Sequence, residues 1–128
     1  MTRKISFTRL ENAVQPLFRE SMTRAESTAD VRKFFAYTLL ELFNGAVEGR
    51  LEPAYEDIEL TPGLAPGYAL AARLREHPVF AELLRESDLA AIVERFAQAA
   101  GNRYKHLEKN PARTEAKMYH GTGGPART

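Results

Sequence analysis

Residues 31–48 constrain the fold most, because almost none of this segment can face water. As an α-helix with about 100° per residue, it places apolar side chains on a continuous arc of roughly 240°. An ordinary surface helix carries an apolar stripe of about 100° or somewhat more. The polar strip that remains holds Lys33, Tyr37, Glu41, Asn44 and Glu48. This helix is therefore either the central post of a small bundle or part of a surface that a second chain covers.

The second alternative leads to a functional hypothesis. A homodimer interface or a protein partner would bury the apolar excess of this helix. The function expected from it is a small non-enzymatic helical interaction or adaptor module, self-associating through apolar helix surface or binding a protein partner. The residues expected to bind the partner are Phe34, Phe35, Leu39, Leu42 and Phe43.

Four further segments, residues 8–22, 67–77, 79–84 and 89–107, show helical periodicity. Thr8 and Glu11 have the spacing of a capping box at the start of the first, and Pro16 falls on its polar side. Ser87 or Asp88 is placed to cap the last. The pattern predicts an all-α, single-domain bundle of four to five helices over residues 1–110.

Turn residues mark the two ends of the central helix. Ser27 or Asp30 can cap its start through a side-chain oxygen, and Gly49 can end it in a left-handed conformation. The prolines and glycines of residues 53–67 then exclude a long helix. Ile58 and Leu60 alternate with acidic residues, which leaves open a minor two-stranded extended pair with residues 5–7.

The composition excludes several classes of site and location. The 128-residue chain contains no cysteine, which rules out disulfides, thiolate metal sites and a cysteine nucleophile. Neither a signal-peptide apolar run nor a membrane span is evident, so a cytoplasmic protein is expected. No sequence motif indicates a cofactor, and no catalytic or metal-binding residue is assigned.

The charge is uneven along a chain whose formal net charge is +1. Residues 50–102 hold five Lys/Arg against nine Asp/Glu, whereas residues 103–128 hold six against two. Residues 111–128 are expected to form a flexible, disordered basic tail. The alternative function is therefore an accessory nucleic-acid-binding protein, because cations attract phosphates. Its binding residues would be Arg103, Lys105, His106, Lys109, Arg113 and Lys117.

The remaining polar residues favour structural roles. His77 is expected to end a helix and meet its carbonyls rather than act in catalysis, so an enzyme is disfavoured. Glu56, Asp57 and Glu59 are interpreted as a solvated acidic turn. Arg103 lies at the edge of an apolar arc and is expected to pair with an acid from residues 50–102.

Overall fold

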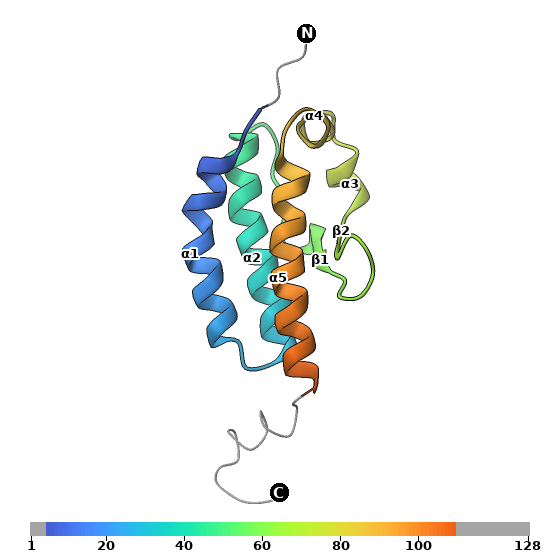
Figure 1. Cartoon of the computed structure of the whole chain (residues 1–128). Helices are drawn as coiled ribbons and strands as arrows, with labels where there is room; N and C mark the ends of the chain where they lie inside the picture. The colour runs from blue at the N-terminus through green and yellow to red at the C-terminus, as the bar shows by residue number, and fades with distance from the viewer. Residues whose placement is uncertain (1–4, 110–128) are drawn as a thin grey trace, which may run out of the picture.

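The computed structural model describes residues 5–109, which form an all-α domain with five α-helices and one two-stranded antiparallel pair (Figure 1). The helices are α1 (Thr8–Arg24), α2 (Thr28–Val47), α3 (Ala72–Arg75), α4 (Pro78–Glu86) and α5 (Leu89–Lys109). A 3-10 turn, η1 (Tyr55–Asp57), leads into β1 (Ile58–Leu60), which pairs with β2 (Tyr68–Leu70). The expected fold class is confirmed.

Helix α2 is the central post of the bundle. It packs against α1 on one side and α5 on another, while β1 and η1 contact it from a third direction (Figure 1). Its phenylalanines pack against other elements of the core. The rings of Phe43 on α2 and Phe80 on α4 meet edge to face, with their centroids 4.9 Å apart. Phe18 and Phe96 make the same kind of contact between α1 and α5 at 4.8 Å. Such aromatic pairs stabilise a core beyond the area that they bury.

The expected caps of α2 are formed. The Ser27 hydroxyl accepts a hydrogen bond from the backbone N–H of Asp30 at 3.1 Å. At the other end, Glu48 and Gly49 both have positive φ, 51° and 82°, so the helix ends in left-handed backbone. Gly45 does not end the helix. It gives Leu10 of α1 room, because a Cβ at this glycine would lie 2.9 Å from a Leu10 methyl carbon.

The expected capping box of α1 is not formed, and the helix continues through Pro16. The backbone N–H of Phe7 donates to the Asp88 carboxylate at 2.8 Å, and Glu11 pairs with Arg95 of α5 instead. Asp88 and Glu11 therefore both connect the start of α1 with α5. The capping box is absent because Phe7 rather than Thr8 is the N-cap, and Glu11 gains charge-assisted hydrogen bonds from Arg95.

The two-stranded extended pair that the sequence left open is formed, but residues 58–60 pair with β2 and not with residues 5–7. β1 pairs with β2 in the register Ile58 with Leu70 and Leu60 with Tyr68, and Ile5 forms one bridge with Ser87. Residues 61–67 close the hairpin through backbone hydrogen bonds, and a short loop costs less entropy than a distant pairing. The helix expected over residues 67–77 is accordingly reduced to the single turn of α3.

None of the helices within residues 5–109 combines the length and the apolar character needed to cross a membrane.

Candidate interaction surface

The apolar face of α2 lies inside the domain. Phe35, Leu39, Leu42 and Phe43 are fully buried within one chain, and Phe34 is partly buried against the core. This placement corrects the expectation that these residues meet a partner. Helices α1, α4 and α5 and strand β1 cover the wide apolar arc. Helix α2 is therefore the central helix of a bundle, which was the first of the two alternatives drawn from the sequence.

The polar strip of α2 forms an exposed surface instead. Lys33, Tyr37, Glu41, Asn44 and Glu48 are all exposed, as the helical periodicity predicted. The Tyr37 ring packs against that of Tyr55 from η1, with centroids 5.1 Å apart and planes tilted by 46°. Tyr37 and Tyr55 are 53% and 39% exposed, which makes them the two exposed residues among the phenylalanines and tyrosines of residues 5–109. We call the strip together with Tyr55 the tyrosine face.

An ion pair fixes the turn that carries Tyr55. Arg73 of α3 donates from Nε to Asp57 Oδ1 at 3.0 Å and from Nη2 to Asp57 Oδ2. The same Nη2 donates to the Glu52 carbonyl at 3.1 Å, and Asp57 also accepts the backbone N–H of Ala54 at 2.8 Å. These contacts hold residues 52–57 in one conformation. The turn that carries Tyr55 is therefore fixed by contacts within the domain.

This arrangement corrects the interpretation of the acidic turn as solvated. Asp57 is only 6% exposed, and a buried carboxylate requires a cation and hydrogen-bond donors. Arg73 and the Ala54 amide supply both. Glu56 and Glu59 remain exposed as expected.

An open hollow of about 640 Å³ adjoins the tyrosine face. Asn44 of the α2 strip and Ala54, the neighbour of Tyr55, lie on its wall. The remaining lining residues are Leu51, Glu52, Pro53, Arg73 and His77. The hollow therefore continues the tyrosine face toward the junction of α3 and α4, with mostly polar groups in its wall.

His77 begins a helix rather than ending one, which corrects its expected position. Its Nδ1 accepts the backbone N–H of Val79 at 3.2 Å, and Pro78 occupies the first position of α4. His77 therefore serves as the N-cap of α4 and also lies on the wall of the hollow.

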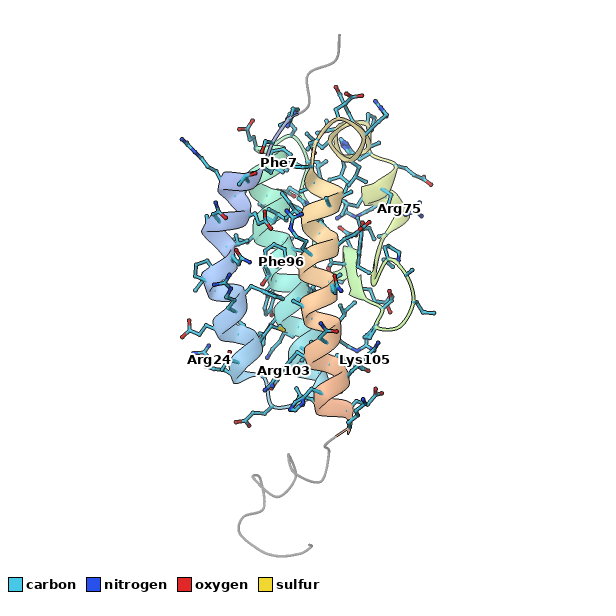
Figure 2. The ribbon with its side chains drawn as sticks, viewed as in Figure 1. Phe7, Arg24, Arg75, Phe96, Arg103 and Lys105 are labelled. Carbon is cyan, nitrogen blue, oxygen red and sulfur yellow. The ribbon has the colours of Figure 1, made fainter. Side chains whose placement is uncertain are left out.

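Arg103 does not pair with an acid, which corrects the second expectation for α5. Its Nη2 donates to the backbone carbonyls of Thr23 and Ala25, at 3.5 and 3.0 Å, where α1 ends (Figure 2). A cation at a helix C-terminus meets carbonyls that lack intrahelical partners. Arg103 therefore ties α5 to the end of α1.

The other predicted nucleic-acid residues divide into two groups. Lys105, His106 and Lys109 are exposed on the last turns of α5, whereas Arg113 and Lys117 lie outside the described residues. Tyr104 is half-buried and is also engaged, because Arg32 of α2 lies over its ring at 5.0 Å and donates to its hydroxyl at 3.1 Å. The cationic surface of the described part of α5 is thus smaller than the sequence suggested.

No three His, Asp or Glu side chains within residues 5–109 lie together in an arrangement that could hold a metal ion. Comparison of the chain with family models, with curated proteins and with solved structures gives no match.

Two features of this surface were absent from the sequence reasoning. Tyr37 stood out as the one aromatic residue of the α2 polar strip, but nothing in the local pattern around Tyr55 linked the two rings. The spacing of Asp57 and Arg73, 16 residues apart across the hairpin, likewise shows no periodic signal. The first relationship depends on how η1 packs on α2, and the second on how the β1–β2 hairpin brings Arg73 back to Asp57.

Proposed function

We propose that the protein is a small non-enzymatic helical interaction module that binds a polypeptide partner through the tyrosine face. The observation that supports this proposal is the exposed, preordered Tyr37–Tyr55 pair on a side of α2 that nothing else in residues 5–109 covers. Tyrosine is enriched at protein interfaces, because it buries a large area at a low cost in side-chain entropy. A fixed aromatic pair reduces this cost further.

The hollow makes an extended segment the suitable form of partner. Asn44 lies seven residues after Tyr37, which separates them by about 10 Å along α2. An extended peptide covers that distance with about three residues. Such a segment would contact both rings and then reach the polar wall of the hollow, where side-chain donors and acceptors would fix its register.

The proposal is tested by selecting random 12-residue peptides displayed on phage against the folded chain. Enriched peptides, prepared synthetically, should bind the wild type and lose at least tenfold in affinity for the Tyr37→Ser/Tyr55→Ser variant. The matched control is Leu17→Ser, which removes a different apolar side chain that is 65% exposed on α1. Circular dichroism would establish that both variants remain folded.

Two results would contradict the proposal. The first is a selection that yields no peptide with measurable affinity. The second is a set of peptides that bind the double tyrosine variant as well as the wild type. Sedimentation at micromolar concentration tests separately the self-association that the sequence predicted.

Nucleic-acid binding is the second candidate function, supported by the exposed Lys105 and Lys109 one helical turn apart on α5. Labelled single-stranded RNA and DNA should then bind the full chain with an affinity that falls steeply with salt. The variant Lys105→Gln/Lys109→Gln should weaken this binding. Unchanged binding in that variant would eliminate these residues as the site.

A further inference from the structure

The tyrosine face lies among carboxylates that form no ion pair. Within residues 5–109, Glu41, Glu48, Glu52, Glu56 and Glu59 are exposed, and none of them makes an ion pair. By contrast, Asp57 and Glu11 are each bound by an arginine. The five unpaired side chains come from the α2 strip and from the segment that carries Tyr55, which are the two elements of the face.

The two basic residues of this part of the chain offset these charges only in part. Residues 33–59 contain Lys33 and Arg50 against six acidic residues, of which Asp57 is already paired with Arg73. Arg50 turns back to the end of α2, where Nε donates to the Val47 carbonyl at 2.8 Å and Nη2 to that of Ala46 at 3.2 Å. The Lys33 ammonium lies 5.4 Å from the centroid of the Phe34 ring. The net negative potential therefore acts on whatever approaches the two tyrosines.

The aromatic rings favour the same sign of ligand charge. The face of a tyrosine ring attracts cations through its quadrupole, and a guanidinium also stacks on it. Residues 5–109 contain one such contact, since Arg32 lies over Tyr104 and donates to its hydroxyl. An arginine of a partner could make the equivalent contact with Tyr37 or Tyr55 while a neighbouring carboxylate accepts its hydrogen bonds.

We infer that the tyrosine face binds an arginine- or lysine-bearing segment of a partner protein. This inference rests on the proposed function and specifies the chemistry of the partner. The rings bind the cationic groups, Glu41 and Glu56 beside them accept hydrogen bonds, and the hollow takes the continuing backbone. A second copy of this face is disfavoured as the occupant, because a symmetric contact would bring like charges together. Nucleic-acid phosphates are repelled for the same reason.

The test uses two labelled peptides of about nine residues that differ in charge alone. One contains Gly-Arg repeats, and the other has citrulline, the neutral isostere, at every arginine. Fluorescence anisotropy against the full chain should show binding of the arginine peptide and at least tenfold weaker binding of the citrulline peptide. Raising the salt from about 50 mM to 300 mM should weaken the binding by screening exposed charges.

Matched variants separate site binding from general attraction to an acidic protein. Glu41→Gln/Glu56→Gln and Glu82→Gln/Glu108→Gln remove the same number of exposed carboxylates, but only the first pair lies beside the tyrosines. The first variant should lose at least fivefold in affinity for the arginine peptide, and the second less than twofold. Tyr37→Leu/Tyr55→Leu, which keeps apolar area and removes the aromatic faces, should also lose at least fivefold.

Equal binding of the arginine and citrulline peptides would overturn the inference, and so would equal losses in the two glutamate variants. The phage selection distinguishes this failure from that of the proposed function. Neutral peptides that still require Tyr37 and Tyr55 would leave the interaction module supported and reject only the cationic partner. An absence of any tyrosine-dependent peptide would reject both.

Discussion

Arg73 and Asp57 form a bidentate ion pair that joins α3 to the η1 turn, and the carboxylate is almost completely buried. The arginine side chain is 57% exposed, so water screens one partner and not the other. The exposed guanidinium of Arg73 therefore holds the buried carboxylate of the turn from the solvent side. The exposed position of Tyr55 depends on a contact that the tyrosine itself does not make.

Replacing Asp57 should therefore destabilise the domain and release the turn. Asp57→Ala removes the acceptor of two Arg73 groups and of the Ala54 amide, and we expect a loss of about 2–3 kcal/mol in the free energy of unfolding. Urea unfolding followed by circular dichroism measures it. Arg85→Ala is the control, because Arg85 itself is exposed and its pair with the partly buried Glu86 should contribute at most about 0.5 kcal/mol. Similar losses in the two variants would contradict the structural role assigned to Asp57.

Removing the Arg103 side chain should weaken the attachment of α5 to α1. Arg103→Ala leaves the Ala25 carbonyl without its charged donor, and we expect a loss of about 1 kcal/mol in the free energy of unfolding. The buried Nε of Arg103 makes no hydrogen bond, which reduces the loss. Lys105→Ala, two residues along and exposed, should change stability by less than about 0.5 kcal/mol. Equal effects would mean that Arg103 does not hold the end of α1.

The periodicity of the sequence predicted the helical framework, because it depends on local backbone geometry and on which side chains avoid water. The buried and exposed sides of α2 follow from this pattern, as does the Ser27 cap. The pattern did not show which elements bury the apolar arc of α2. The arc was wide enough to bind a partner, but in the tertiary structure α1, α5 and the hairpin bury it.

The candidate site was less predictable, because its contacts join residues from separate elements. Tyr37 and Tyr55 meet only when η1 packs on α2, and Asp57 is buried only because the hairpin brings Arg73 to it. Charged residues were also assigned to the wrong partners. Glu11 and Arg103 had plausible local or acidic partners in sequence, but long side chains reach whichever element packs nearby.

Two glycines should respond in opposite directions to the same substitution. Gly49 has φ of 82° with open space around its Cα, so Gly49→Ala forces an L-residue into left-handed backbone and should cost about 1 kcal/mol. Gly101 lies inside α5, also with open space where a Cβ would stand. Gly101→Ala should stabilise the domain by about 0.5–1 kcal/mol. Thermal unfolding of the two variants measures both effects, and a shift in the same direction would contradict the assigned backbone conformations.

Tyr68 should make the domain less stable at alkaline pH. Partial burial raises the pKa of its hydroxyl above the usual value of 10.0, and the charge of Glu94 on α5 raises it further. The unfolded chain therefore loses this proton at a lower pH than the folded chain. Above about pH 10 the unfolded state binds fewer protons than the folded state, so the free energy of unfolding falls as the pH rises through this range.

The variant Tyr68→Phe isolates this contribution. It keeps the ring and removes the titrating hydroxyl, so the fall in stability between about pH 9 and 11 should be shallower than in the wild type. Urea unfolding at each pH gives the two curves. Because lysines and the other tyrosines titrate in both proteins, the difference between the curves is the quantity that tests the prediction. In the Glu94→Gln variant the stability should also fall less steeply with pH than in the wild type, since this variant lacks the second cause of the raised Tyr68 pKa. Parallel curves for wild type and Tyr68→Phe would show that the fold does not favour the neutral hydroxyl.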